Sequence, residues 1–202
     1  MKLLRLQDYG VEKFVAPYLD SRARVLNAGC GNRRFGPNVL NVDITARPAV
    51  DLVHDLNEPL PEALGTFDAI LCSAVLQYCR APHKVLVNLR EALVPGGRLY
   101  VSAPWVQQVC TDTPDRFRFS GDGLRGVVED AGFVVEMVAP SIRPGAALAW
   151  LAWELADHAT PSRVMNVGLR VLVGAAVWPL RFIRTIAPHR SAGAFYCVAR
   201  KP

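Results

Sequence analysis

The chain has 202 residues, of which 51% are hydrophobic and 20% are charged. That apolar content excludes a disordered chain, and the irregular spacing of 15 Gly and 15 Pro excludes a fibrous one. Five cysteines without a CxxC pair predict neither a disulfide framework nor a zinc site, and they are typical of a protein from a reducing compartment.

Charge is distributed unevenly along the chain. Residues 1–139 carry 15 Lys+Arg and 16 Asp+Glu, whereas residues 140–202 carry 8 and 2, a net of +6. A near-neutral body disfavours an enzyme that acts on nucleic acid, and the basic end indicates contact with an anionic surface such as a membrane. Charges at Lys2, Arg5 and Asp8 interrupt the apolar core that a signal peptide would need. We therefore expect a cytoplasmic protein without a nucleic-acid partner.

Apolar runs and turn residues alternate along the chain in the pattern of strands followed by helices. In chain order, the sequence predicts a helix over 8–20, strands over 23–28, 39–43, 50–53 and 67–73, a helix over 81–93, a strand over 98–104, a helix over 121–131 capped by Ser120, and strands over 133–138 and 192–202. Such alternation is typical of an α/β domain whose mostly parallel sheet is covered by helices on both faces.

Residues 140–190 separate the last two predicted strands, where a hairpin turn would be enough. Loops of that length without secondary structure are uncommon, so we predict two helices there. The chain as a whole, 1–202, is predicted to form a single domain, with 140–190 as an apolar and basic helical insertion within it.

A strand that ends in glycines carries the clearest functional signal. Residues 25–31 read VLNAGCG, so that Gly29 and Gly31 follow the strand directly, and Asp43 ends the next predicted strand. Glycine lets a ligand lie against bare backbone, and an acidic side chain at the end of the neighbouring strand can accept hydrogen bonds from both hydroxyls of a ribose. The alternative is a tight turn beside an exposed aspartate.

A nicotinamide-dependent oxidoreductase is a rival interpretation of these residues. Its fingerprint needs a third glycine three positions after the second, and an acid about 20 residues further on. Here Gly36 comes five positions after Gly31, and Asp43 comes 14 positions after Gly29. The ten residues over 29–38 leave room for one helical turn or none, whereas pyrophosphate binding relies on a helix N-terminus. A ligand with a ribose and without phosphates fits better.

Five segments of the sequence share an order with a known family. They read VLNAGCGNRRFGPNVLNVDI, VDLVHDLNEPLP, FDAILCSAVLQYC, LREALVPGGRLYVSAP and DRFRFSGDGLRGVVEDAGF. Over 24–139, and again over 192–202, the sequence resembles the class I S-adenosylmethionine-dependent methyltransferases, in particular a bacterial branch with a short first crossover that is often associated with glycan and lipid biosynthesis. The resemblance implies a Rossmann-like, doubly wound mixed sheet of seven strands whose last strand is antiparallel, and S-adenosylmethionine as the cofactor.

The resemblance also implies a role for each motif residue. The two glycines would pass under the methionine and ribose parts of the cofactor, and Asp43 would hold the ribose hydroxyls. Asp55 and the backbone of Leu56 would meet the adenine amino edge, although an aspartate before Pro59 can equally form a turn. Ser73 would line the pocket through its backbone. The candidate cofactor-binding residues are Asn27, Gly29, Gly31, Asp43, Asp55, Leu56 and Ser73.

Two places depart from the family's pattern. Asn27 stands where the family usually has an acid two positions before the first glycine, and its carbonyl can orient a water or the cofactor's ammonium group without supplying a charge. Gln77 and Tyr78 stand where the family usually has glutamate and histidine, which puts histidine chemistry there in doubt. These departures leave open a second interpretation, a non-catalytic, membrane-docked module that keeps the fold.

The loop after the strand over 98–104 carries the first candidate catalytic residue. Substrates of such sheets bind beyond the carboxyl ends of the strands. Asp115 is the first candidate for a base or for a group that orients the acceptor, and Tyr78 is the second. The alternative is that Asp115 pairs with Arg118 and fixes the loop. The four histidines lack metal-ligand spacing, so no metal site is predicted.

The sequence therefore predicts methyl transfer from S-adenosylmethionine to a small-molecule, glycan or lipid-linked acceptor, and it determines neither the acceptor nor the oligomeric state. The insertion over 140–190 adds a location. Its longest uncharged apolar run, Val171–Leu180, is half the roughly 20 residues needed to span a bilayer. The flanking and neighbouring residues suit a helix lying in the interface on the inner face of a membrane, with a substrate lid or a dimer interface as alternatives. These residues are Arg170, Arg181, Arg184, Trp150, Trp153 and Trp178.

Overall fold

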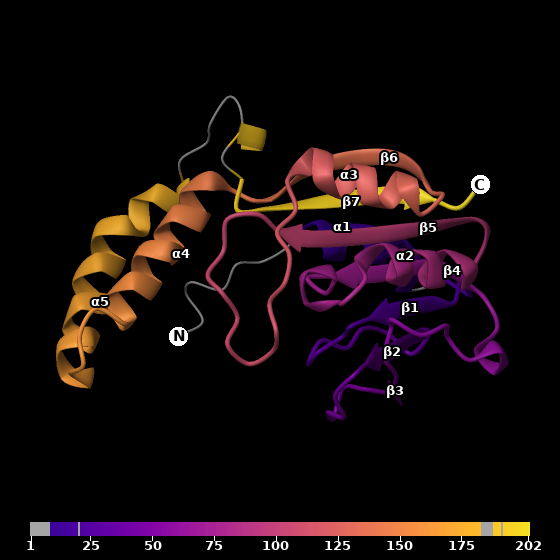
Figure 1. The fold of residues 1–202 in the computed structure, drawn as a ribbon, viewed down its shortest axis with the longest axis horizontal. Coiled ribbons are helices and arrows are strands. Elements are labelled where there is room, and N and C mark those ends of the chain that lie inside the picture. The colour runs from indigo at the N-terminus through magenta and orange to yellow at the C-terminus, as the bar shows by residue number, and fades with distance from the viewer. Residues whose placement is uncertain (1–8, 20, 183–187, 191) are drawn as a thin grey trace.

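The computed structural model describes residues 9–19, 21–182, 188–190 and 192–202, which form a sheet of seven strands with helices around it (Figure 1). The strands are β1 Val25–Ala28, β2 Val39–Asp43, β3 Leu52–Val53, β4 Phe67–Ser73, β5 Leu93–Pro104, β6 Val134–Ile142 and β7 Ala194–Arg200. The α-helices are α1 Tyr9–Leu19, α2 Pro82–Glu91, α3 Gly121–Asp130, α4 Pro144–Asp157 and α5 Arg163–Val177.

The strand order is β3-β2-β1-β4-β5-β7-β6. The first five strands pair in parallel, and β7 lies between β5 and β6 and is antiparallel to both. This arrangement confirms the fold class expected from the sequence, a seven-stranded mixed sheet with an antiparallel last strand. The order also reverses direction between β1 and β4, which is the point where ligands bind in open α/β sheets.

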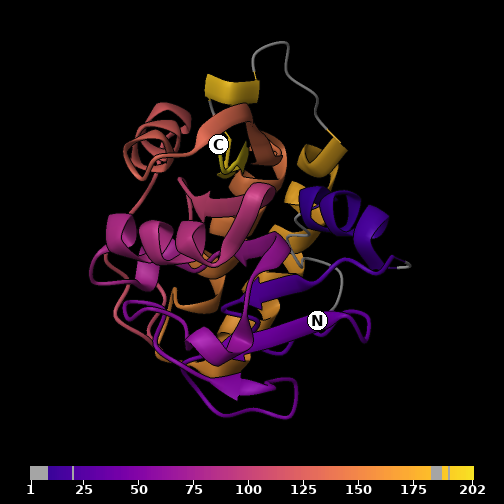
Figure 2. The ribbon, with the colours of Figure 1, turned by 90° about the vertical axis from the view of Figure 1, so that its right-hand side faces the viewer.

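Helices cover both faces of the sheet, as Figure 2 shows by viewing it along another axis. On one face, α2 and α3 bury Leu86, Leu89 and Leu124 against the strands. On the other face, α1 buries Val11 and Phe14, and Phe14 packs on the fully buried Tyr100 of β5 with ring centroids 5.4 Å apart. Burial on both faces explains why β1 and β4 consist mostly of apolar residues.

Two boundaries differ from the expectation by more than two residues. The strand β5 begins at Leu93, so Pro95-Gly96-Gly97 lies within it, because Leu93 pairs with Phe67 before the register shifts between Phe67 and Ala69. The strand β6 runs to Ile142 because β7 pairs with it as far as Ala194. The first crossover contains no helix over 29–38, as the short spacing predicted.

The insertion forms the two predicted helices, which lie together beyond the end of the sheet at which β5 terminates (Figure 1). Ser162 caps α5 by accepting a hydrogen bond from the Met165 amide at 3.4 Å. The two helices approach closely at Gly174, where the absence of a side chain leaves room for the ring of Trp153. A Cβ on Gly174 would lie 2.7 Å from that ring. Arg184 and the side chain of Arg181 lie outside the described residues.

Candidate functional site

The turn after β1 requires glycine for two different reasons. Gly29 has a φ of +72°, and a Cβ on it would lie 2.2 Å from Cγ2 of Val75. Gly31 has a φ of +56°, and a Cβ on it would meet no atom within 4 Å. Only glycine adopts such φ values without strain, so both residues fix the turn. Gly29 is tightly packed, whereas Gly31 presents bare backbone to open space.

Asp43 at the end of β2 is tied to this turn. Its Oδ2 accepts a hydrogen bond from the Gly31 amide at 2.8 Å, and its Oδ1 accepts one from the Thr45 amide at 3.0 Å. A carboxylate has about four acceptor positions, so two remain for a ligand. The structure thus brings Gly29, Gly31 and Asp43 together, as the sequence predicted.

A cavity of 330 Å³ lies over this turn at the carboxyl ends of the parallel strands. Its lining includes Gly31, Asp43, Asp55, Leu56 and Tyr78. Gly31, whose Cβ position is open, is thus part of this lining. All seven residues predicted to bind a cofactor line this cavity or the larger cavity beside it. Gly29, Gly31, Asp43, Asp55 and Leu56 line the smaller cavity, and Asn27, Gly29 and Ser73 line the larger one.

Asp55 also has the local role that the sequence left open. Its Oδ1 accepts hydrogen bonds from the amide of Asn57 at 2.9 Å and from Nδ2 of Asn57 at 2.7 Å. These hydrogen bonds favour the charged form and lower the pKa of the Asp55 carboxyl. The next residue, Leu56, is buried and its carbonyl accepts a hydrogen bond from Nδ2 of Asn88 at 3.0 Å. The turn therefore holds Asp55 ionised at the edge of the cavity.

A second cavity, of 660 Å³, extends from the ends of β1, β4 and β5 to helix α4. Ser73 lies on its lining, and its Oγ is 3.0 Å from Oγ of Ser102. Gly29 and Ala74 line both cavities, so the two spaces meet at these two residues. A ligand that extends from one cavity to the other would pass Gly29 and Ala74.

Ala74 is a site residue that the sequence analysis missed. Within the described ranges it is the non-glycine residue with a positive φ, +56°, and its amide donates to the Ser102 carbonyl at 2.9 Å. Backbone strain of this kind persists where the surroundings hold it, and it is concentrated at functional sites. The only sequence signal for Ala74 is its place directly after a buried strand.

Asn27 is part of a buried polar network. Its Nδ2 donates to the Arg33 carbonyl at 3.1 Å and to Oδ1 of Asn41 at 3.0 Å. Asn41 in turn donates to Oδ2 of Asp51 at 2.9 Å, and Asp51 pairs with Arg34 at 2.8 Å. A carboxylate cannot donate, so this network explains why an amide stands here in place of the acid usual in the family.

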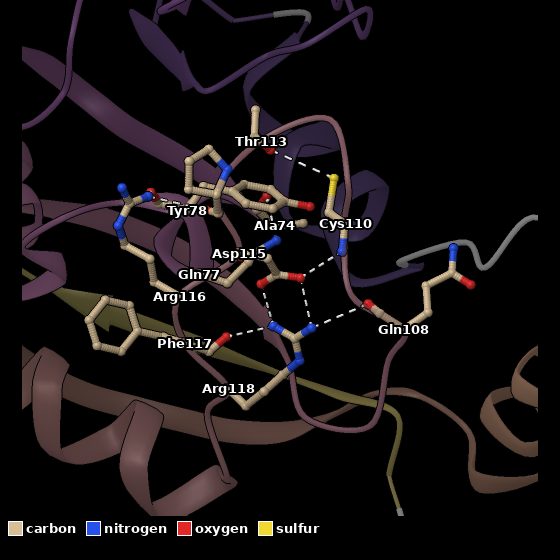
Figure 3. Close-up of polar contacts among 11 residues, drawn as sticks. Ala74, Gln77, Tyr78, Gln108, Cys110, Thr113, Asp115, Arg116, Phe117 and Arg118 are labelled. Atoms are coloured by element: carbon tan, nitrogen blue, oxygen red, sulfur yellow. Dashed lines mark hydrogen bonds and ion pairs between the residues drawn. The ribbon is translucent and has the colours of Figure 1, made fainter.

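The loop between β5 and α3 is held by an ion pair (Figure 3). Both carboxylate oxygens of Asp115 accept hydrogen bonds from the guanidinium of Arg118, at 2.7 Å for Nη2 and Oδ2, and Oδ2 also accepts from the Cys110 amide at 2.9 Å. The Asp115 side chain is only 2% exposed. Arg118 lowers the pKa of the Asp115 carboxyl through these hydrogen bonds. This geometry favours the alternative in which Asp115 fixes the loop.

Tyr78 lies between the loop and the smaller cavity. Its carbonyl accepts a hydrogen bond from Nη1 of Arg116 at 2.9 Å, and its ring lines the cavity beside Cys110 and Thr113 (Figure 3). Burial raises the pKa of the Tyr78 hydroxyl. The hydroxyl therefore stays protonated near neutral pH, where it can donate a hydrogen bond to a ligand.

Comparison of the sequence with known proteins identifies a matching family and a relative. A family model described as a methyltransferase domain matches residues 6–138. A tRNA U34 carboxymethyltransferase from Azotobacter vinelandii is 35% identical over an alignment of 109 positions, and the match covers 42% of this chain and 34% of that protein. The chain thus spans about a third of the length of this relative.

Solved structures share the fold across nearly the whole chain. The [4+2]-cyclase SpnF is 20% identical with a TM-score of 0.61, covering 96% of this chain and 81% of its own. A 1,6-didemethyltoxoflavin-N1-methyltransferase from Burkholderia thailandensis, solved with S-adenosylhomocysteine, is 17% identical with a TM-score of 0.60, covering 96% and 77%. Phosphoethanolamine N-methyltransferase 2 from Haemonchus contortus, solved with S-adenosyl-L-methionine, is 16% identical with a TM-score of 0.57, covering 96% and 53%. At such identities the likeness shows the fold, and a fold can host more than one chemistry.

Proposed function

The chain belongs to the class I S-adenosylmethionine-dependent methyltransferase family, and from this premise we propose that it transfers a methyl group from S-adenosylmethionine to an acceptor bound in the larger cavity. The observation that supports this most strongly is the meeting of two cavities at Gly29 and Ala74. One cavity has the residues for an adenosine and the other has room for a second molecule.

The residues of the smaller cavity fit the cofactor chemically. The backbone at Gly31 leaves the space that a Cβ would fill, and Asp43 keeps two acceptor positions for ribose hydroxyls. In Asp55, Oδ1 accepts the hydrogen bonds of the turn from Asn57. Its Oδ2 accepts no hydrogen bond from the described residues, so Oδ2 can accept one from an adenine amino group. When bound, S-adenosylmethionine supplies a methyl group activated by a positively charged sulfur.

Catalysis in this proposal depends mainly on positioning. Transfer of an activated methyl group requires alignment and exclusion of water more than strong acid–base chemistry. Tyr78 acts as a hydrogen-bond donor at the edge of the cofactor cavity, and Asp115 acts on the loop through Arg118. Ser73 and Ser102 supply polar contacts on the acceptor side.

Calorimetry with S-adenosylhomocysteine tests the cofactor proposal. We expect binding by the full chain, and a loss of about 10- to 100-fold in Asp43→Asn, because hydrogen bonds to a charged group contribute about 1.5–3 kcal/mol. Asp130→Asn, at the exposed end of α3, is the matched control and should bind normally. Absence of binding at millimolar ligand would overturn the proposal, and tighter binding of NADH would favour the oxidoreductase interpretation.

A second part of the proposal concerns the surface at which this protein reaches its acceptor. On α5, Val164, Val167 and Val171 recur at i, i+3 and i+7 and are 84%, 49% and 65% exposed. Leu172, next to Val171, is 69% exposed, and Leu155 on α4 is 75% exposed. By length and composition, the stretch Arg163–Leu180 could cross a membrane, and only 6% of it is buried.

We propose that this surface docks on the cytoplasmic face of an anionic membrane and that the acceptor is lipid-linked. Arg170 lies in the middle of the stretch and pairs with Asp157, which suits a helix that lies in the interface better than one that spans it. The net charge of +6 over 140–202 would attract anionic lipid.

Flotation with phosphatidylglycerol vesicles at low salt tests the docking. The full chain should float, and a Val171→Glu/Leu172→Glu variant should not, because charge on the apolar face opposes insertion. Val134→Glu on β6, a residue 42% exposed on the sheet edge, is the control and should float. If the full chain stays in solution, the docking proposal is wrong and a small-molecule or glycan acceptor is favoured.

The non-catalytic module remains the second candidate because of Gln77 and Tyr78, which replace the usual pair at the end of β4. Cofactor binding without methyl transfer to any lipid, glycan or small-molecule extract would favour it. Methyl transfer that disappears in Asp43→Ala would exclude it.

A further inference from the structure

One helix forms a whole side of the larger cavity. On α4, Trp150, Trp153, Glu154 and Asp157 are spaced i, i+3, i+4 and i+7, and all four line the cavity of 660 Å³. Two indole rings and two carboxylates thus face the same space. Indole faces attract cations, and carboxylates complement them, so this surface suits a positively charged group.

Half of that surface, Trp153 and Asp157, already binds a cation of the chain itself. Arg170 of α5 pairs with Asp157 at 3.0 Å, and its Cζ lies 5.8 Å from the ring centroid of Trp153. Trp153 also packs on Gly174, so Trp153 and Asp157 both contact α5 and hold the two helices together. The guanidinium shows which kind of group this surface accepts.

The other half, Trp150 and Glu154, has no such arginine beside it among the described residues. Among the described residues, the carboxylate of Glu154 meets only His158, whose exposed ring has its Nδ1 3.9 Å from Oε2. Arg33, the other cation on the cavity lining, lies on the turn after β1 and makes no ion pair within the described ranges. Trp150 and Glu154 therefore combine an aromatic face with a carboxylate that has no strong internal counter-ion.

We propose that Trp150 and Glu154 form a subsite for an ammonium group of the methyl acceptor, an inference that rests on the methyl-transfer function proposed above. The acceptor then carries an ammonium group, which enters directed at α4. This group binds and orients the acceptor and is not the nucleophile, because a protonated or quaternary nitrogen has no lone pair with which to attack the methyl group. Arg33, on the same cavity lining but in the turn after β1, is left for the carboxylate of the amino-acid part of the donor. The charges of the cavity thus separate the two molecules and orient each of them.

Choline and its uncharged isostere 3,3-dimethyl-1-butanol are the probes that isolate the charge. Calorimetry on the full chain, saturated with S-adenosylhomocysteine, should show choline binding at least about 10-fold more tightly, as expected for a cation–π contact with partial desolvation. Trp150→Leu and Glu154→Gln should each weaken choline binding by about 5- to 30-fold. Affinity for S-adenosylhomocysteine should stay unchanged in both variants.

Matched controls lie outside the cavity of 660 Å³. Trp105→Leu removes an indole that is 42% exposed, and Glu129→Gln removes a carboxylate paired with Arg125 on α3. Both controls should bind choline normally. Glu154→Gln keeps the shape of the side chain, so its result stands even if Trp150→Leu fails to fold.

Equal binding of the two probes, or choline binding that neither α4 variant weakens, would overturn the subsite. If wild-type chain does not bind S-adenosylhomocysteine, the proposed function fails instead, and choline binding measured without the cofactor still tests the subsite. Phosphatidylglycerol vesicles with and without phosphatidylethanolamine distinguish the source of the amine. A preference for the ethanolamine lipid that disappears in Glu154→Gln indicates a headgroup, and choline binding without that preference indicates a soluble amine.

Discussion

Gly29 and Gly31 share a positive φ but differ in their surroundings, and this difference allows the cofactor site to be tested separately from the fold. In Gly29→Ala, the new Cβ would lie 2.2 Å from Val75. We expect a loss of about 3 kcal/mol or more in the free energy of unfolding, from left-handed strain plus overpacking.

Gly31→Ala should behave differently, because its Cβ meets no atom within 4 Å. The expected cost is about 1 kcal/mol, a shift of about 2–4 °C in Tm. Affinity for S-adenosylhomocysteine should nevertheless fall by at least about 10-fold, since the Cβ enters the space proposed for the ligand. Thermal unfolding and calorimetry on the two variants check this pair of predictions. Normal binding by Gly31→Ala would contradict the placement of the cofactor.

Asn27→Asp tests the polar network beneath the turn. The variant restores the acid usual in the family but loses both donated hydrogen bonds and places a carboxylate against Oδ1 of Asn41. We expect a loss of about 3 kcal/mol in denaturant unfolding. Asn32→Asp, exposed in the same turn, should change stability by less than about 0.5 kcal/mol. A stable Asn27→Asp variant would show that the network does not require an amide.

At the scale of elements, the loop between β5 and α3 depends on Asp115. Arg118 lowers the pKa of the folded-state carboxyl below its usual value of about 3.9, so the pair stabilises the protein above that pH and the contribution is lost as pH falls through the lowered folded-state pKa. Asp115→Asn should cost about 2 kcal/mol at pH 7, and the difference from wild type should shrink below about pH 4.

Hydrogen exchange at the Cys110 amide, which donates to Asp115, reports on the same loop and should speed up in Asp115→Asn at pH 7. Arg116 donates to carbonyls rather than to a carboxylate, so Arg116→Lys is a control that should leave the pH dependence unchanged. A difference between Asp115→Asn and wild type that is as large at pH 3 as at pH 7 would contradict the role of the charged pair.

At the scale of the whole molecule, the sheet and the helical insertion are connected through two adjacent strand ends. Ile142 of β6 pairs with Ala194 of β7, and the Gly193 amide donates to the Ile142 carbonyl at 3.0 Å. A short Gly-Ser linker in place of residues 144–191 can therefore close a hairpin. We expect the shortened chain to fold and to bind S-adenosylhomocysteine within about twofold of the full chain, because the smaller cavity, with Gly31, Asp43 and Asp55, has no lining residue from the deleted range.

The same shortened chain should lose choline binding and vesicle flotation, since α4 and α5 carry both surfaces. Circular dichroism, calorimetry and flotation measure the three properties on one protein. A shortened chain that no longer folds would show that the buried alanines of α4, such as Ala147 and Ala149, belong to the folding unit.

Local sequence determined much of this protein. The buried strands β1 and β4, the capped helix at Ser120, the helix-free first crossover and the paired helices of the insertion all follow from apolar period, turn residues and spacing, because each of these depends on neighbours in the chain. The closeness of Gly31 to Asp43 also followed, since adjacent parallel strands end at the same edge of the sheet.

Only the tertiary structure decided how residues far apart in the sequence combine. The strain at Ala74 depends on its hydrogen bond to Ser102, the amide of Asn27 is required by Asn41, and Trp150 and Glu154 face the cavity because α4 returns over the ends of the strands. None of these partners is within ten residues of the residue it constrains, and a sequence pattern carries no record of contacts at that separation. Their physical reason is packing, which fixes backbone angles, hydrogen-bond partners and cavity linings once the whole chain has folded.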